Sequence, residues 1–349
     1  MAVMCCGERE WTVVAVSPQI EDLINDDMFL DLSRILDRRV LLKCEGLNLA
    51  GSVKMKAAAS MVVAAEEEGR LRPGSVLVES SSGNLGVALS MIAANRGYRF
   101  VCVTDPRSNL SNRKLMTAAG AEVVVIEQRD GNGGFLGSRI RYVQELCASD
   151  SRYVWLNQYE NRFNWIAHYR TTAQAILRNV PDLDFLFVGA GTTGTLMGCA
   201  RYFKEVAHPA KIIAVDTVGS VTFGGPSMPR YIPGLGTSRR PELLDESYVD
   251  EVVLVEEGEA VRTCRSLARH GFLLGGSTGT VLAAVNRRMR HEAGNPTCVA
   301  ISPDLGERYL DSIYDDAWVT EHFGLDVVAG VNTHRQPASW SVAVAASGT

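Results

Sequence analysis

Short runs of β-branched residues alternate along this chain with longer stretches that have the spacing of helices. Such alternation predicts parallel strands joined by helices, which is an α/β fold. Six of the runs predict strands, at 75–80, 99–104, 121–127, 185–190, 211–216 and 297–302. Between them we expect helices that include 53–68, 85–95, 195–205 and 278–292.

The length of the chain predicts two domains. It has 349 residues, whereas a single hydrophobic core usually stops growing near about 250–300 residues. We expect an N-terminal α/β domain over 1–158 and a C-terminal α/β domain over 159–328. Residues 329–349 lose the periodicity and are predicted to form a loose tail.

Charge and hydropathy restrict the kind of partner. The net charge of −5 gives no electrostatic reason to expect nucleic acid or a membrane surface, so small molecules are the expected partners. The first residues include Glu8, Arg9 and Glu10, where a signal peptide needs an apolar core. No later stretch reaches the roughly 18 apolar residues of a membrane helix. We therefore expect a cytoplasmic protein.

The cysteines predict neither disulfides nor a metal site. There are eight of them, none in a C-x-x-C pair, and several lie in apolar runs such as FVCVTD. Buried free thiols are the expectation. The adjacent Cys5 and Cys6 leave a metal-binding or reactive role open.

Four glycine- or serine-rich turns precede predicted helices, at 51–54, 80–86, 189–195 and 275–280. The free N–H groups and the positive dipole end of a helix favour anions at such positions. In the first turn, Ser52 is predicted to cap the helix and Lys54 to lie in its first turn. The dipole there lowers the pKa of an amine, and a neutral amine can form an imine. The alternative for Lys54 is a solvated lysine.

The other three turns have equally plain alternatives. Segment 80–86 offers hydroxyls and an amide to a carboxylate, or is an ordinary capped turn. Segment 189–195 predicts a phosphate site, but Gly189, Gly191 and Gly194 also satisfy G-x-G-x-x-G, and Asp216 follows at the distance that a dinucleotide-binding fold requires. On this segment alone an NAD-dependent dehydrogenase is the alternative. Segment 275–280 offers a hydroxyl to a ring nitrogen, or caps a helix.

Taken in order, these segments resemble the motifs of fold-type II pyridoxal phosphate (PLP) enzymes of the cysteine synthase and cystathionine β-synthase family. NLAGSVK resembles its Schiff-base motif, SSSGNLG its asparagine loop, GTTGT its phosphate loop and GGSTGT its pyridine-nitrogen loop. The likeness runs from about residue 40 to Trp318 and includes ISPDLGERYLD. Four ordered motifs are more specific than one glycine fingerprint, so the dehydrogenase becomes a distant alternative.

The resemblance implies a two-domain fold like the tryptophan synthase β-subunit, pyridoxal 5′-phosphate as cofactor and a homodimer that acts on small amino-acid substrates. It implies that Lys54 is the catalytic imine lysine, that Asn84 contacts the phenolic oxygen and that Ser277 contacts the ring nitrogen. A neutral hydroxyl does not stabilise a protonated pyridinium as a carboxylate does, which suits β-elimination. The phosphate would lie on Gly191, Thr192, Thr193, Gly194 and Thr195. The substrate carboxylate would lie on Ser81, Ser82 and Gln158.

Within the family, the chain resembles N-(2-amino-2-carboxyethyl)-L-glutamate synthases, which make 2,3-diaminopropionate precursors for siderophores and peptide antibiotics. The stretches that carry this likeness are 133–140, 156–165, 218–224 and 233–244. The chain departs from cysteine synthases at Leu85, usually a threonine, and at Met55 and Lys56, usually Asp-Arg. Gly191 also departs from some relatives, which carry a serine.

The resemblance implies a β-replacement that joins O-phospho-L-serine and L-glutamate through an aminoacrylate, with Lys54 as the base. Arg139 and Arg240 would contact the donor phosphate or the glutamate carboxylates, or are ordinary surface arginines. Two alternatives remain beside the dehydrogenase. One is a cysteine synthase that uses O-acetylserine or O-phosphoserine and sulfide. The other is a non-catalytic PLP-fold scaffold, against which the intact Lys54, Asn84 and Ser277 argue.

Overall fold

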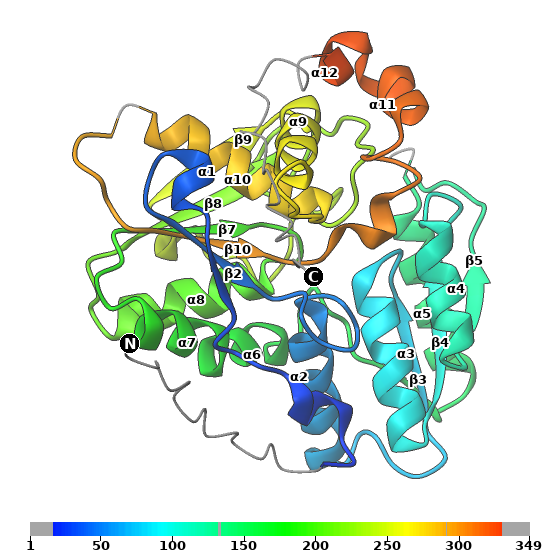
Figure 1. Ribbon diagram of the computed structural model, residues 1–349. Coiled ribbons are helices and arrows are strands. Elements are labelled where there is room, and N and C mark those ends of the chain that lie inside the picture. The colour runs from blue at the N-terminus through cyan, green and yellow to red at the C-terminus, as the bar shows by residue number, and fades with distance from the viewer. Residues whose placement is uncertain (1–16, 132–133, 291, 330–349) are drawn as a thin grey trace, which may run out of the picture.

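The computed structural model describes residues 17–131, 134–290 and 292–329, and it contains two sheets flanked by helices (Figure 1). The larger sheet has six strands in the order β1 (Phe29–Asp31), β2 (Val40–Cys44), β10 (Cys298–Ser302), β7 (Phe185–Gly189), β8 (Lys211–Thr217) and β9 (Glu251–Val255). The smaller sheet has four strands in the order β5 (Glu122–Val125), β4 (Arg99–Thr104), β3 (Val76–Ser80) and β6 (Tyr153–Trp155). All strand pairs are parallel except β1 with β2. The predicted α/β class is confirmed.

Helices cover both faces of each sheet. The first half of the chain contributes η1 (Ile20–Leu23), α1 (Ser33–Leu36), α2 (Lys54–Glu67), α3 (Asn84–Arg96), α4 (Leu110–Ala118), α5 (Leu136–Ser149), α6 (Phe163–Arg170) and α7 (Thr172–Asn179). The second half contributes α8 (Gly194–Glu205), η2 (Glu246–Tyr248), α9 (Glu257–Ala268), α10 (Gly276–Met289), η3 (Gly306–Tyr309), α11 (Asp316–Phe323) and α12 (Leu325–Ala329). None of these helices is long and apolar enough to cross a membrane.

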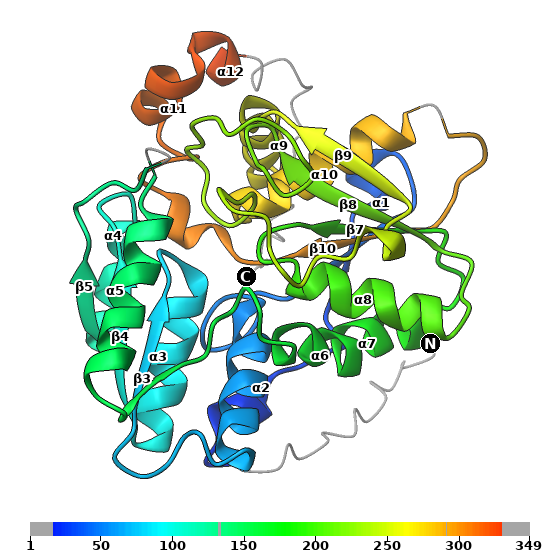
Figure 2. The same ribbon diagram turned by 180° about the vertical axis from the view of Figure 1, so that it is seen from behind.

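The central strands β3, β7 and β10 are continuous apolar runs because both of their faces are buried, whereas the edge strand β9 exposes Val252 and Leu254. In β3, Leu77 packs into the core formed with α2 and α3, whereas Val76 and Val78 pack against Val143 of α5. Figure 2 shows α5 on the side of the smaller sheet opposite to α3. In the larger sheet, α10 packs on one face and α7 with α8 on the other. Burial on both faces removes the alternation of polar residues that a half-exposed strand has.

The two sheets interleave along the chain. The segment that contains β1 and β2 lies in the larger sheet, and β2 pairs with β10 so that Cys44 is opposite Ser302. The smaller sheet and α2 follow before the chain returns to the larger sheet at β7. The division into domains over 1–158 and 159–328 stays a prediction. The pairing of β2 with β10 has a direct consequence for the site, because it brings the residues after Cys44 beside those after Ser302.

The start of α2 differs from the prediction. Its N-cap is Val53, and no side chain caps it, so the prediction that Ser52 caps this helix is wrong. Ser52 is fully buried and forms an isolated backbone bridge with Asp304 instead. The chain therefore enters α2 along the segment that follows β10, and Lys54 is placed next to that segment.

The cysteines of the described residues are free, and all but the half-buried Cys147 are buried. This confirms the buried thiols for that part of the chain, whereas Cys5 and Cys6 lie outside it. Of the predicted tail over 329–349, only Ala329 is described, and it ends α12. The described residues contain no group of three side chains that could hold a metal ion.

Candidate cofactor and substrate site

A cavity of about 140 Å³ lies where the loops that follow β3, β7 and β10 meet the start of α2. It brings together residues from all four predicted segments and from several other parts of the chain, among them Arg139, Gln158 and the loop at 233–237. Of the predicted site residues, its lining includes Lys54, Ser81, Ser82, Asn84, Arg139, Gln158, Gly191, Thr192 and Ser277. A second cavity of about 20 Å³ is lined by Lys54 and by the whole of the predicted phosphate segment, Gly191 to Thr195. Lys54 therefore lies at the junction of the two.

The environment of Lys54 favours its neutral form. Burial lowers the pKa of its amine, and the carboxyl group of Asp304 opposes that shift. The pKa of Lys54 was expected to be lowered by the helix dipole, whereas burial is the main cause in the structure. A neutral amine is the form that attacks a carbonyl carbon and accepts a proton.

The serine-rich turn leads into α3 and lines the main cavity. The Ser81 Oγ accepts hydrogen bonds from the backbone N–H groups of Gly83 at 3.3 Å and of Gly86 at 3.0 Å. Gln158 is buried and donates through Nε2 to the carbonyl oxygen of Ser80 at 3.1 Å. These contacts at the start of α3 therefore also fix side chains that line the cavity, and the role of this turn as a carboxylate site stays a prediction.

A buried carboxyl group that the sequence analysis did not single out connects two predicted cofactor contacts. Asp304 is fully buried, and its Oδ1 accepts a hydrogen bond from Ser277 Oγ at 2.9 Å. Its Oδ2 accepts from Asn84 Nδ2 at 2.8 Å and from the Tyr309 hydroxyl at 2.6 Å. Burial raises the pKa of Asp304, and these three donors oppose the shift. Polar residues directly after a buried strand, in SPDLGERY, were the available signal.

Asn84 is held from a second side as well. Arg308 donates to its Oδ1, and the same guanidinium donates to the carbonyl oxygen of Ala50 at 2.5 Å. The amide of Asn84 is thus oriented by a carboxylate and a guanidinium, which allows only one placement of its oxygen and nitrogen.

The start of α8 has the features of an anion site. Thr193 is its N-cap and adopts a left-handed φ of 65°, which is unusual for a β-branched residue. Its Oγ1 is buried and has no hydrogen-bond partner among the described residues. A Cβ on Gly194 would lie 2.0 Å from Asn164 Oδ1, so glycine is required there. An open hydroxyl and the positive end of a twelve-residue helix fit a phosphate group.

Thr195 is placed differently from its neighbours. Its Oγ1 lies 3.2 Å from Nε2 of His168, a buried residue of α6. The hydroxyl thus contacts the protein interior, whereas the predicted role was a contact to the phosphate.

Arg139 is a buried cation on the main cavity. It is 8% exposed, and its Nε and Nη1 have no hydrogen-bond partner among the described residues. Its nearest carboxylate is that of Asp105, with Nε 3.4 Å from Oδ2. A guanidinium with open donors is suited to bind a carboxylate or phosphate. Arg240 does not line the cavity and instead pairs with Glu246 at 2.6 Å on the surface.

Two further observations concern the sequence alternatives. Leu85, at the position usually held by threonine, packs into the core beside α2 and also lines the main cavity. Asp216, the carboxylate that a dinucleotide-binding site would need, lines neither cavity. Its Oδ1 accepts a hydrogen bond from the backbone N–H of Thr217 at 2.8 Å.

Known proteins agree with this geometry. The model of the family described as "Pyridoxal-phosphate dependent enzyme" matches residues 29–304. An N-(2-amino-2-carboxyethyl)-L-glutamate synthase of Ralstonia nicotianae is 39% identical over 309 residues, which cover 87% of this chain and 91% of that protein. The family match spans all four predicted segments, at 51–54, 80–86, 189–195 and 275–280.

Solved structures show the same fold. The crystal structure of an O-ureido-L-serine synthase has a TM-score of 0.78 and 32% identity, covering 88% of this chain and 100% of that one. A hydrogen sulfide-producing enzyme from Fusobacterium nucleatum has a TM-score of 0.79 and 30% identity, covering 84% of this chain and 100% of that one. Family, fold and an amine beside an anion site together identify the cofactor. The chain belongs to the pyridoxal-phosphate dependent enzymes of fold type II, and its cofactor is pyridoxal 5′-phosphate.

Proposed function

We propose that this enzyme catalyses a β-replacement that joins O-phospho-L-serine and L-glutamate to give N-(2-amino-2-carboxyethyl)-L-glutamate. The observation that carries the proposal is Arg139, a buried guanidinium with open donors on the cavity that Lys54 also lines. Both proposed substrates bring anionic groups beyond the amino-acid carboxylate, and such groups need partners where water is excluded. The 39% identity to a synthase named for this product supports the same reading.

Each residue has a proposed task. When bound, PLP withdraws electrons from the α-carbon of the amino-acid substrate, which makes the α-proton acidic. Lys54 holds the cofactor, and its neutral amine removes that proton and later returns it. Ser81, Ser82 and Gln158 bind the substrate carboxylate. The phosphate of the cofactor binds at Gly191 to Thr195, and Asn84 and Ser277 bind its ring.

The net reaction balances without an oxidant or reductant. The bond between the β-carbon of phosphoserine and its phosphate oxygen breaks, and inorganic phosphate leaves with the electron pair. A bond forms between the same carbon and the α-amine of glutamate, which releases one proton. The product is a precursor of 2,3-diaminopropionate, a building block of siderophores and peptide antibiotics.

A cysteine synthase reaction with sulfide is the second candidate, because one structural relative is named as a hydrogen sulfide-producing enzyme. Sulfide needs no guanidinium, however, and the donor phosphate alone would give Arg139 a partner in either reaction. The acceptor is therefore the point that an experiment must decide.

The deciding experiment crosses donors with acceptors. PLP-loaded enzyme is incubated with O-phosphoserine or O-acetylserine, each with glutamate, aspartate or sulfide, and the products are identified by mass spectrometry. We expect phosphoserine with glutamate to give N-(2-amino-2-carboxyethyl)-L-glutamate at the highest rate. Cysteine from sulfide without any glutamate adduct would replace this proposal with the cysteine synthase.

We also propose that the enzyme acts as a homodimer in the cytoplasm, as the family resemblance implies. Light scattering of the purified full chain, with and without PLP, measures the mass in solution. A monomer at micromolar concentration would contradict the dimer.

A further inference from the structure

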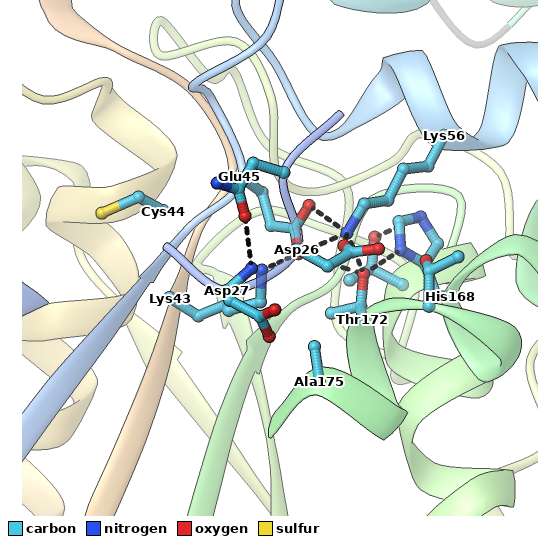
Figure 3. Close-up of polar contacts among 12 residues, drawn as sticks. Asp26, Asp27, Lys43, Cys44, Glu45, Lys56, His168, Thr172 and Ala175 are labelled. Carbon is cyan, nitrogen blue, oxygen red and sulfur yellow. Dashed lines mark hydrogen bonds and ion pairs between the residues drawn. The ribbon is translucent and has the colours of Figure 1, made fainter. Parts of the chain in front are cut away.

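A buried chain of polar side chains links α2, the helix that begins at Lys54, to the start of α8. Its members are Glu45 after β2, Lys56 on α2, His168 on α6 and Thr172 at the start of α7, all at most 5% exposed. Figure 3 shows these side chains pointing toward one another. Lys56 follows Lys54 by two residues in the first turn of α2, so this chain of contacts is attached to the helix that carries the cofactor lysine.

Glu45 is the anionic centre of the cluster. Its Oε2 lies 2.7 Å from Lys56 Nζ, and its Oε1 lies 2.9 Å from Lys43 Nζ. Lys56 also pairs with Asp26. Burial by itself would raise the pKa of Glu45, but the two lysines outweigh it and lower the pKa to about 2. Glu45 is therefore ionised, and its oxygens can only accept hydrogen bonds.

The Thr172 hydroxyl has three partners that fix its proton. Its Oγ1 lies 3.0 Å from Glu45 Oε1, 2.9 Å from Lys56 Nζ and 3.0 Å from His168 Nδ1. A hydroxyl donates once and accepts twice. Because the carboxylate only accepts and the ammonium only donates, the proton of Thr172 points to Glu45. The remaining lone pair faces Nδ1, so Nδ1 must carry a hydrogen.

The tautomer of His168 fixes the direction of the next hydrogen bond, which joins His168 to Thr195. Burial lowers its pKa to about 3, with Lys56 contributing in the same direction, so the ring is neutral. A neutral ring with its hydrogen on Nδ1 has a bare Nε2. The Oγ1 of Thr195 lies 3.2 Å from Nε2, and the Thr195 hydroxyl is therefore the donor.

We propose that His168 is a positioning residue that couples the cofactor-lysine helix to the phosphate loop by accepting a hydrogen bond from the hydroxyl of Thr195. The coupling runs from Lys56 through Glu45 and Thr172 to His168 and then to the first turn of α8. Thr195 accordingly binds the protein with its hydroxyl, and the open hydroxyl of Thr193 remains as a side-chain donor for the phosphate. The inference rests on the assignment of residues 191–195 to the cofactor phosphate.

The coupling has a physical use. One PLP molecule must reach the amine of Lys54 with its aldehyde and the start of α8 with its phosphate. A displacement of either helix by a fraction of an ångström weakens both attachments, because the cofactor ring between them is rigid. Contacts behind the binding residues commonly fix such geometry.

The tautomer is tested first, by nitrogen NMR on histidine-labelled full-length protein, with His168→Gln identifying the resonances. We expect a hydrogen on Nδ1 and none on Nε2, both without cofactor and in the PLP-loaded protein. A hydrogen on Nε2 in the loaded protein would mean that Thr195 has turned to the phosphate, which overturns the proposal. This readout does not depend on activity.

The coupling is tested by the dissociation constant of PLP in a matched pair of variants. Thr172→Val keeps the volume of the side chain but leaves Nδ1–H of His168 without an acceptor, whereas Thr172→Ser keeps the hydroxyl. We expect PLP binding to weaken roughly tenfold in the valine variant and to stay near wild type in the serine variant. Thr195→Val and Thr195→Ser provide the same contrast if the valine at 172 prevents folding.

Thr193→Ala distinguishes a failure of the phosphate location at residues 191–195 from a failure of the coupling through His168. If it leaves PLP affinity unchanged, the location of the phosphate at 191–195 fails. If it weakens binding while both valine variants bind PLP like wild type, the phosphate location holds and the coupling through His168 is overturned. Weaker binding in Thr193→Ala and in the valine variants, with recovery by serine, supports both.

Discussion

Ser277 Oγ donates a hydrogen bond to Asp304 Oδ1 at 2.9 Å, so the hydroxyl expected at the cofactor ring nitrogen has a buried carboxyl group behind it. A serine has one proton. When Asp304 is ionised and accepts the hydrogen bond from Ser277, the Ser277 hydroxyl can only accept a hydrogen bond from the ring nitrogen. The partner expected for the ring nitrogen is therefore not Ser277 alone, because Asp304 controls the direction in which the Ser277 hydroxyl donates its hydrogen bond.

Asp304→Asn is expected to reverse the Ser277 hydroxyl. An asparagine has one acceptor oxygen, and Asn84 Nδ2 can only donate, so the new amide nitrogen should face Ser277. We expect a folded protein that is about 1–3 kcal/mol less stable, because one donor loses its acceptor. The absorbance of bound PLP should change, since Ser277 would then donate to the ring. Tyr309→Phe is the control, because it removes one donor from Oδ2 and leaves the Ser277 contact in place. Identical spectra for wild type and Asp304→Asn would contradict this role.

Lys54→Ala is expected to abolish turnover and leave the fold intact, since alanine is favourable at a helix start. Borohydride reduction of the wild type should attach the cofactor to the peptide that contains Lys54, as mass spectrometry can detect. Lys204→Ala, at an exposed lysine, should label and turn over like wild type. Covalent labelling of a different lysine would show that Lys54 has the wrong assignment.

Much of the fold was predictable because its signals are local. The six predicted strands match β3, β4, β5, β7, β8 and β10 within two residues at each end. Strand β2 was missed because Lys43 interrupts its apolar run. That lysine is fully buried, and the pairing that allows its burial comes from Glu45, which also pairs with Lys56 of α2. The contact between Glu45 and Lys56 joins two separate elements, and no local pattern contains it.

The site residues likewise fall into those that a local motif predicts and those whose role depends on contacts between distant parts of the chain. Lys54, Asn84, Ser277 and the phosphate loop each lie in a short motif with its own glycine and hydroxyl pattern. Asp304 was missed because its role depends on Asn84, which is 220 residues away. The role of the Thr195 hydroxyl depends likewise on His168, a residue of another helix.

Arg139→Gln is expected to raise KM for the anionic substrates about ten- to hundredfold, because charge-assisted hydrogen bonds are each worth roughly 1.5–3 kcal/mol. The substrate whose KM rises most identifies the group that Arg139 binds. Arg240→Gln is the matched control, since that arginine pairs with Glu246 on the surface. Retention of PLP by both variants confirms that the site is intact. Equal KM values for Arg139→Gln and wild type would remove Arg139 from the substrate site.

The last prediction concerns the pH dependence of stability that a neutral, buried His168 imposes. Its folded pKa of about 3 lies below the ordinary histidine value of 6.5. Below pH 6.5 the unfolded chain binds a proton that the folded protein does not bind. His168 therefore lowers the free energy of unfolding as pH falls toward 3, by about 1.4 kcal/mol per pH unit.

Glu79 contributes with the opposite sign. Burial raises the pKa of this carboxyl to about 7, although Trp155 donates to it. Between pH 7 and the ordinary value of 4.5 the folded protein binds the extra proton, so Glu79 adds stability as pH falls through this range. The overall pH curve thus contains opposing contributions in one range. Only the difference between wild type and a variant isolates each of them.

Urea unfolding of wild type, His168→Gln and Glu79→Gln at pH 7, 6 and 5 separates the two groups. At pH 7 the His168→Gln variant should be less stable than wild type, because Thr172 and Thr195 lose a partner. That gap should narrow by about 1.2 kcal/mol between pH 6 and 5, since the variant has no histidine to protonate on unfolding. Over the same interval the free energy of unfolding of wild type should rise relative to that of Glu79→Gln. A constant gap for His168→Gln would mean that His168 is not held neutral in the folded protein, and the order of donors from Glu45 to Thr195 would fail with it.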